Sequence, residues 1–218
     1  MTIRLLIADD QELVRTAFAL LVATEPDMTV VGEAADGHAA VDLARRAHPK
    51  VVLMDVRMPG CDGIAATRQL TADPTLTDTR ILILTTFDLD EYVFGAVRAG
   101  ASGFLLKDTP ASQLLTAIRI IAAGEALLAP SATRRLIAEY ASRPQPAERP
   151  VHSLDTLTDR ETEVLRLIAS GLSNDEICHR LHVSMATTKT HIGRLLAKLA
   201  ARDRAQLVIA AYEAGLVT

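Results

Sequence analysis

The segment around Asp55 constrains the fold more than any other part of the sequence. An apolar run of strand length, residues 51–54, ends abruptly in this single carboxylate, and a proline-glycine turn follows at positions 59 and 60. A continuous apolar run bounded by turn residues is typical of a strand buried on both faces in a parallel sheet. In open α/β sheets, ligands bind beyond the carboxyl ends of such strands. We therefore expect Asp55 at the ligand-binding edge of a sheet.

Three other short apolar runs, residues 3–8, 81–84 and 103–106, also end in polar side chains. The residues that follow them are Asp9 and Asp10, Thr85, and Lys107. Because the carboxyl ends of parallel strands meet at one edge, three carboxylates, a hydroxyl and an ammonium should converge there. Oxygen ligands with retained water suit Mg²⁺, and without an ion the crowded carboxylates would raise one another's pKa. The sequence therefore indicates a magnesium site.

Segments with the apolar spacing of helices separate these strands. The expected helices are 12–24, 37–47, 64–70, 91–99 and 110–123, and residues 28–33 supply a further strand. Five strands that alternate with five helices predict a parallel sheet with right-handed crossovers, covered on both faces. The predicted fold class is α/β, a flavodoxin-like doubly wound five-stranded parallel sheet of order 2-1-3-4-5.

The chain of 218 residues is long enough for two ordinary domains. A stretch rich in proline and charge, residues 142–150, reads as a semi-rigid linker, and residues 131–141 before it could form a helix. We therefore predict a first domain at 1–125, a linker at 126–153 and a second domain at 154–218.

The second domain should be all-α, with four helices. Thr158 with Glu161, and Ser173 with Glu176, have the spacing of capping boxes, and Ser184 is placed to cap a longer third helix at 185–199. A fourth helix is expected at 203–214. Short helices joined by a tight turn and followed by a longer one have helix-turn-helix spacing.

Charge and cysteine content exclude several classes of protein. The formal net charge is −4, but residues 1–130 carry 11 basic and 17 acidic side chains, whereas residues 151–218 carry eight of each. Cys61 and Cys178 lack the spacing of a zinc site or a disulfide framework. No apolar stretch approaches the roughly 18 residues of a membrane span, and no signal peptide is evident. We expect a cytoplasmic protein with no membrane partner.

The motifs of both halves occur in the order of a known family. The first half contributes Asp9-Asp10, residues 54–60, Asp62-Gly63, Leu84-Thr85 and residues 99–107. The second half contributes residues 157–161, 164–165, 171–174, 176–177 and 183–184, together with Thr187, residues 189–191 and residues 198–199. Thr85 and Lys107 follow Asp55 by 30 and 52 residues, as in that family. The chain resembles a two-component response regulator of the NarL/FixJ type, with a receiver domain joined to a LuxR-type helix-turn-helix.

The resemblance implies a role for each residue of the acidic edge. Asp55 would accept a phosphoryl group from a sensor histidine kinase. Asp10, Asp55 and the backbone carbonyl of Arg57 would hold Mg²⁺, with Asp9 acting through water. Lys107 and Thr85 would contact the phosphoryl oxygens. Beyond this self-phosphorylation and dephosphorylation, we expect no enzyme activity.

The resemblance also implies how the signal would leave the acidic edge. Phe104 holds the position of an aromatic switch that turns inward as Thr85 moves toward the phosphoryl group. Phosphorylation would promote a homodimer that binds paired half-sites on double-stranded DNA, and RNA polymerase is a candidate partner. The sequence does not identify the dimer face.

The third helix of the second domain carries the expected DNA contacts. Its apolar side must pack on the other helices, which leaves a polar side for the major groove. By matching family positions, we expect Lys189 and Thr190 to contact base edges, and Thr187, Arg194 and Lys198 to contact phosphates.

Three residues of this helix depart from the family pattern. Thr188 replaces a usual core valine, so its hydroxyl must either find a backbone carbonyl within its own helix or weaken the packing. Gly193 replaces a longer side chain and lowers helix propensity by roughly 1 kcal/mol. Ala200 stands where glycine commonly ends the helix. These departures bear on DNA affinity and sequence preference more than on the fold.

Other readings of the same residues stay open. An aspartyl-phosphate phosphatase would also use Asp55 as nucleophile, but Arg57 occupies the position where such an enzyme needs a second carboxylate. A binding module whose C-terminal helices bind RNA or protein is a further alternative. Cys61 could sense redox state or be a small loop residue, Cys178 should pack between helices, and His191 could contact phosphate or solvent.

Overall fold

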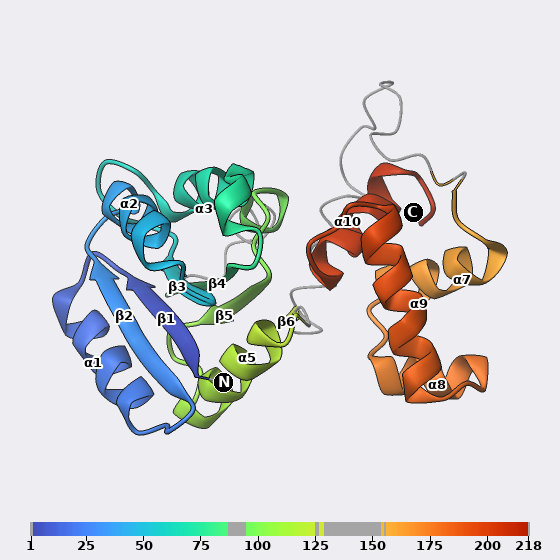
Figure 1. Cartoon of the computed structure of the whole chain (residues 1–218), viewed down its shortest axis with the longest axis horizontal. Coiled ribbons are helices and arrows are strands. Elements are labelled where there is room, and N and C mark those ends of the chain that lie inside the picture. Colours follow the sequence, from blue (N-terminus) through green and yellow to red (C-terminus); the bar gives the residue numbers. More distant parts are fainter. Residues whose placement is uncertain (1, 87–94, 125–126, 129–153, 155, 218) are drawn as a thin grey trace. The chain divides into compact units, whose positions relative to one another are not determined.

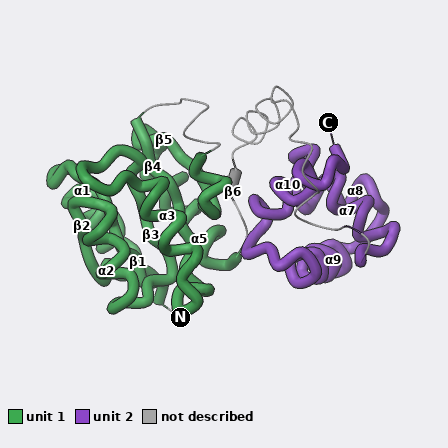
Figure 2. Tube along the Cα trace, turned by 90° about the horizontal axis from the view of Figure 1, so that it is seen from above, with its two compact units in different colours: residues 1–129 green, residues 130–218 purple. Residues whose placement is uncertain are grey.

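The computed structural model of the chain describes all residues except 1, 87–94, 125–126, 129–153, 155 and 218. The chain divides into two compact units, residues 1–129 and 130–218, which Figure 2 shows in different colours. The linker and the helix expected at 131–141 lie outside the described residues. The same is true of the start of the helix expected at 91–99, of which residues 95–98 are described and helical.

The first unit alternates strands and helices as the sequence predicts. Its elements are β1 (Ile3–Ala8), α1 (Glu12–Ala23), β2 (Met28–Ala34), α2 (Gly37–Ala47), β3 (Val51–Asp55), α3 (Gly63–Ala72), the 3₁₀ turn η1 (Pro74–Leu76), β4 (Arg80–Thr85), β5 (Gly103–Leu106), α5 (Ala111–Ala122) and β6 (Leu127–Leu128). The strands are parallel and their order is β2-β1-β3-β4-β5-β6. The predicted order 2-1-3-4-5 is confirmed. The two-residue β6, too short for any periodic signal, extends the sheet beyond the five predicted strands.

Helices cover both faces of this sheet. Figure 1 shows α1 and α5 on one side and α2 and α3 on the other. Alternate strand residues such as Leu5, Leu53 and Leu82 pack against Val22 of α1 and Ile118 of α5 in one buried cluster. Because successive side chains of a strand point to opposite faces, the intervening residues face the other helical layer. Every residue of β3 is buried, as expected for a central parallel strand.

The described part of the second unit consists of helices joined by short turns. They are α7 (Asp159–Ala169), α8 (Asn174–Leu181), α9 (Met185–Lys198) and α10 (Arg204–Glu213). Both predicted capping boxes form. The side chains of Thr158 and Ser173 accept hydrogen bonds from the backbone N–H groups of Glu161 and Glu176, whose side chains in turn accept hydrogen bonds from the backbone N–H groups of Thr158 and Ser173. Ser184 caps α9 as predicted. The local sequence thus fixes where each of these three helices begins.

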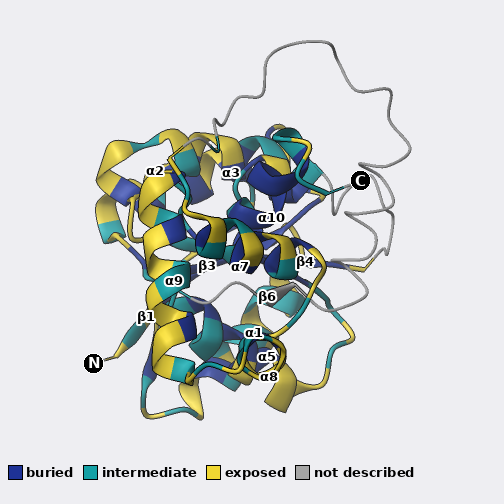
Figure 3. Ribbon diagram, turned by 90° about the vertical axis from the view of Figure 1, so that its right-hand side faces the viewer, coloured by how far each residue is buried: buried dark blue, intermediate teal, exposed yellow. Residues whose placement is uncertain are grey.

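The four helices enclose one apolar core. Val164 and Ile168 of α7, Ile177 of α8, Leu195 of α9 and Leu207 of α10 are all fully buried in it. The opposite side of α9 is exposed along most of its length (Figure 3). None of the helices in the described part of the chain combines the length and apolar character that a membrane crossing requires.

Candidate functional site

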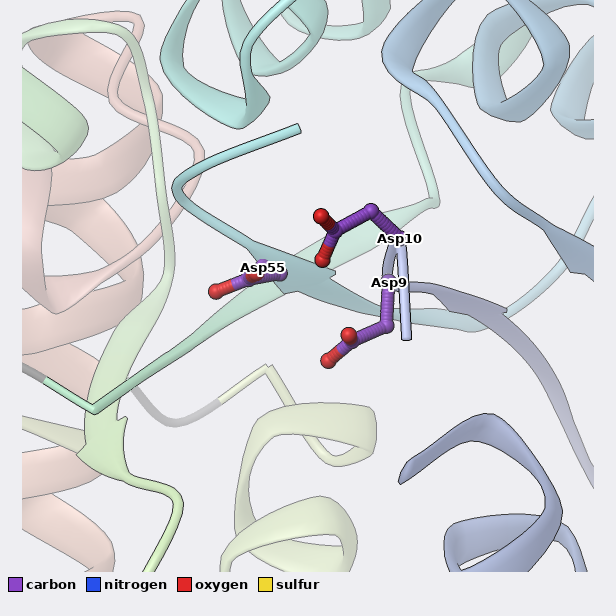
Figure 4. Close-up of side chains that lie close together, drawn as sticks. All are labelled: Asp9, Asp10 and Asp55. Carbon is purple, nitrogen blue, oxygen red and sulfur yellow. The ribbon is translucent and has the colours of Figure 1, made fainter. Parts of the chain in front are cut away.

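Two strand ends bring three carboxylates together. Asp9 and Asp10 directly follow β1, and Asp55 is the last residue of β3, the strand paired with β1 (Figure 4). One carboxylate oxygen from each residue lies within 4.8 Å of the others. Asp9 and Asp55 are 2% and 6% exposed, whereas Asp10 faces solvent. The acidic cluster that the sequence predicts is therefore formed, with its open side at Asp10.

Lys107 lies between the two buried carboxylates. Its Nζ is 2.6 Å from Oδ2 of Asp9 and 3.1 Å from Oδ2 of Asp55, and only 9% of its side chain is exposed. Its backbone N–H donates to the carbonyl of Thr85 at 2.8 Å, so the end of β5 is fixed to the end of β4. A single ammonium thus offsets part of the charge of two carboxylates that would otherwise repel each other.

The carboxyl group of Asp55 is oriented and electrostatically perturbed. Its Oδ1 accepts a hydrogen bond from the backbone N–H of Val56 at 2.8 Å. Burial raises the pKa of Asp55 above its usual range and the charge of Asp9 adds to this, while the hydrogen bond and charge of Lys107 act against it. A further cation at the cluster would favour the ionised form of Asp55.

Gly63 allows the loop after β3 to close over Asp55. Its backbone N–H donates to the carbonyl of Val56 at 2.9 Å. A Cβ at position 63 would lie 1.8 Å from the backbone oxygen of Asp55, so no larger residue fits without displacing the loop. Asp62 then caps α3 by accepting a bond from Ala65 N–H at 2.7 Å. The close approach to the backbone of Asp55 explains Gly63, and the cap of α3 explains Asp62.

The loop after β1 is held by contacts that the sequence analysis missed. Arg15 donates from Nη1 to the backbone carbonyl of Asp9 at 2.7 Å, and Gln11 N–H donates to Oδ1 of Asp9 at 3.0 Å. Arg15 also pairs with Glu33 of β2 at 3.8 Å. An arginine on α1 six residues after Asp9 carries no sequence signal of its own, because the contact depends on how α1 turns back onto the sheet.

The remaining predicted residues of the first unit lie near this edge. Thr85 ends β4 and is buried, and Phe104 of β5 is 4% exposed and in register with Ile83. Arg57 lies two residues beyond Asp55, with an exposed side chain. The switch role of Phe104 and the metal contact from the carbonyl of Arg57 stay predictions.

The donor set of the cluster suits a hard divalent cation. Asp9, Asp10 and Asp55 offer carboxylate oxygens, with one side open for water, which matches the preference of Mg²⁺ for a few carboxylates and retained hydration. The partial neutralisation by Lys107 alone leaves net negative charge at the cluster. These residues therefore fit a magnesium ion.

In the second unit, α9 presents polar side chains on one face. Lys189, Thr190 and Arg194 are exposed. Thr190 donates its hydroxyl proton to the carbonyl of Ala186 at 2.9 Å, and the hydroxyl of Thr187 contacts that of the capping Ser184 at 2.9 Å. All five residues predicted to contact DNA, Lys198 included, are therefore exposed on this helix.

Lys198, the fifth of these residues, has partners within the protein. Its Nζ lies 2.7 Å from Oε2 of Glu161 and donates to the carbonyl of Thr156 at 2.9 Å. Glu161 is 2% exposed, and the bond to Lys198 is the largest cause that lowers its pKa to about 2. The sequence analysis assigned Lys198 to a DNA phosphate and did not anticipate this contact.

The departures in α9 have structural consequences. The hydroxyl of Thr188 is buried and meets the Cys178 thiol of α8 at 3.2 Å, in place of the carbonyl of its own helix that the sequence analysis expected. Cys178 therefore does pack between two helices. Ala200 adopts a left-handed backbone with φ of 50°, which disfavours any residue with a Cβ.

Comparisons with known proteins agree with this geometry. Residues 5–119 match the family model described as response regulator receiver domain, and residues 155–211 match that of the bacterial regulatory proteins of the luxR family. The chain is 45% identical to the uncharacterized transcriptional regulatory protein YxjL of Bacillus subtilis (strain 168), over 99% of this chain and 97% of that protein. It is 39% identical to the transcriptional regulatory protein LiaR of the same organism, over 99% of both chains.

Among solved structures, the response regulator ChrA of a heme-sensing two-component system is similar over the full length. It shares 35% of its residues with this chain, covers 99% of both chains and superposes with a TM-score of 0.53. The similarity to these proteins thus extends across both units.

Proposed function

Because the chain belongs to the response regulators that join a receiver domain to a LuxR-type DNA-binding domain, we propose that it is a transcription factor switched by phosphorylation of Asp55. The observation that carries this proposal is the cluster of Asp9, Asp10 and Asp55 with Lys107 in contact with two of them. A sensor histidine kinase is the phosphoryl donor. The partners are a kinase and DNA, so the protein acts in the cytoplasm.

Asp55 is the nucleophile of the phosphoryl transfer. A carboxylate oxygen forms the new O–P bond while the P–N bond of the kinase phosphohistidine breaks, and the imidazole leaves with the bonding pair. The hydrogen bond from Val56 N–H to Oδ1 fixes the orientation of the carboxylate. Such reactions depend on positioning and on electrostatic stabilisation.

Lys107 and Thr85 stabilise the phosphoryl group after transfer. The ammonium of Lys107 already lies 3.1 Å from Oδ2 of Asp55, so a short movement brings it to a phosphoryl oxygen. Thr85 donates its hydroxyl proton to another oxygen, and Phe104 of the adjacent strand occupies the space that Thr85 vacates. These movements transmit the conformational change from the phosphorylation site to the rest of the first unit.

Asp10, Asp55 and the carbonyl of Arg57 would hold Mg²⁺, with Asp9 acting through water, and the ion would supply positive charge that offsets the negative charge of the transferring oxygens. Apart from gaining and losing this phosphoryl group, the protein performs no chemistry. Arg57 stands where a phosphatase of this kind would need a second carboxylate, which supports that assignment.

The second unit binds promoter DNA as part of a dimer. Lys189 and Thr190 contact base edges, while Thr187 and Arg194 contact phosphates. Residues 151–218 carry no net formal charge, so a single copy binds DNA weakly and a dimer gains by engaging two half-sites. Phosphorylation promotes this dimer, and the bound dimer acts on RNA polymerase.

The proposal is tested by DNA binding before and after treatment with a small phosphodonor and Mg²⁺. The duplex is one that the wild-type chain selects from a random pool, and affinity is measured by fluorescence anisotropy. We expect the donor to strengthen binding by the wild-type chain and to leave Asp55→Asn unchanged. An equal response of both chains, or no duplex binding at all, would rule out the proposed switch.

A further inference from the structure

Glu161 is the most deeply buried carboxylate of α7. It is 2% exposed, and its Oε2 accepts bonds from the backbone N–H of Thr158 at 2.9 Å and from the Thr158 hydroxyl at 3.1 Å. Two neutral donors do not compensate a full charge taken out of water. The carboxylate therefore depends on a cation for its stability in this place.

Lys198 supplies that cation from the last turn of α9. Its ammonium contacts Oε2 of Glu161 at 2.7 Å and donates to the carbonyl of Thr156 at 2.9 Å. Thr156 precedes α7, and Glu161 lies in its first turn. One side chain thus ties the end of the DNA-facing helix to the start of α7 at two points, across 37 positions of sequence.

The alternative use of Lys198 is a contact with a DNA phosphate. A phosphate that drew the ammonium of Lys198 away from Glu161 would leave a buried carboxylate without its partner. Loss of the partner of a buried charge is strongly destabilising, whereas an exposed ion pair returns little. The geometry therefore favours an internal role for Lys198 during DNA binding as well.

We propose that Lys198 is a positioning residue for DNA recognition, which holds α9 against α7 through Glu161 and contacts no phosphate. The inference rests on the proposed DNA-binding function and replaces the phosphate contact first expected for Lys198. Arg194, on the same helix and exposed, remains the phosphate contact and serves as the reference.

The dependence of DNA affinity on salt concentration distinguishes a positioning role of Lys198 from a contact between Lys198 and a phosphate. Each neutralised phosphate contributes about −0.9 to the slope of log affinity against log salt concentration. The full-length chain and its variants bind the selected duplex over a range of salt concentrations, well below their unfolding temperatures. We expect Arg194→Ala to flatten the slope by about one phosphate. We expect Lys198→Met to lower affinity by about tenfold, a fraction of the cost of an uncompensated buried charge, with the wild-type slope.

A second substitution tests the role of Glu161, the partner of Lys198. In the Lys198→Met background, Glu161→Gln removes the uncompensated carboxylate and should recover most of the lost affinity. Glu163→Gln is the matched control, because Glu163 lies two residues further along α7 with an exposed side chain paired to Arg160. That control should recover little, since it changes the net charge equally without touching the buried site.

Three results would overturn the inference while wild-type binding persists. They are a flattened salt slope for Lys198→Met, an unchanged affinity with only a lower unfolding temperature, and equal recovery by Glu161→Gln and Glu163→Gln. Absence of salt-dependent duplex binding by the wild-type chain would instead overturn the proposed function together with this inference.

Discussion

Lys107 offsets part of the negative charge of the acidic edge, the cluster of Asp9, Asp10 and Asp55. It contacts the carboxylates of Asp9 and Asp55, which are buried and belong to different strands. Before any ion or phosphoryl group is added, this ammonium is the group in contact with both. The same side chain can therefore stabilise the resting protein and, after transfer, a phosphoryl oxygen.

Removal of this ammonium should destabilise the first unit. Lys107→Met keeps most of the apolar stem but leaves two buried carboxylates facing each other, so we expect a loss of about 3 kcal/mol in the free energy of unfolding. Urea denaturation followed by circular dichroism measures the loss. Mg²⁺ should restore more stability to Lys107→Met than to the wild type, because a bound cation stabilises the folded state.

Lys50→Met is the control, since Lys50 precedes β3 at the opposite end of the strand from Asp55. An unchanged urea midpoint for Lys107→Met, with no added response to Mg²⁺, would show that the pairing of Lys107 contributes nothing to stability.

At the scale of elements, the sequence predicts what depends on local pattern. The strand order follows from βαβ alternation, and three helix starts in the second unit follow from Thr158, Ser173 and Ser184. The acidic cluster is predictable because parallel strand ends meet at one edge. Local patterns and one topological rule thus account for most of the fold and the site.

The features that sequence reasoning missed depend on how one structural element packs against another. Lys198 and Glu161 are 37 positions apart, and their pairing requires the angle at which α9 packs on α7. The contact of Arg15 with the Asp9 carbonyl and that of Thr188 with Cys178 likewise require packed helices. No spacing rule within a single element contains this information.

Two positions that depart from ideal helix chemistry, one inside α9 and one just after it, can be improved. Gly193 is exposed and a Cβ there would meet nothing within 4 Å, so Gly193→Ala should stabilise the second unit by about 0.5–1 kcal/mol. Ala200 has a left-handed backbone, so the reverse exchange, Ala200→Gly, should stabilise it by about 1 kcal/mol. Thermal unfolding measures both. Destabilisation by either exchange would contradict the backbone geometry described for that residue.

Glu161 should make the stability of the second unit depend on pH. Its pKa is lowered from 4.5 to about 2, chiefly by Lys198, so the folded state binds fewer protons than the unfolded state between these values. The stabilisation is complete above pH 4.5 and is lost as pH falls toward 2. The difference in unfolding free energy between wild type and Glu161→Gln, measured in urea at several pH values, should shrink over this window. A difference independent of pH would contradict the pairing, and Glu163→Gln controls for the loss of an exposed carboxylate.

At the scale of the whole molecule, the acidic cluster and α9 belong to different compact units. In the proposed function, dimerisation would couple them, because two tethered DNA-binding units gain affinity for paired half-sites. Phosphorylation of the first unit would in this way control DNA binding by the second.

Phosphorylation should therefore raise the apparent mass of the protein. Sedimentation velocity with a small phosphodonor and Mg²⁺ should show a shift toward the dimer, and Asp55→Asn should remain at the mass of its untreated form. A wild-type chain that persists as a monomer would remove dimerisation from the mechanism.

The site of phosphorylation is the most direct test of the account. Mass spectrometry of the chain treated with a small phosphodonor, intact and after proteolysis, locates the acquired group. We expect one phosphoryl group per chain on Asp55, acquired only with Mg²⁺ present, and none on Asp55→Asn. Label that persists in Asp55→Asn, or that maps to another residue of the wild type, would contradict it.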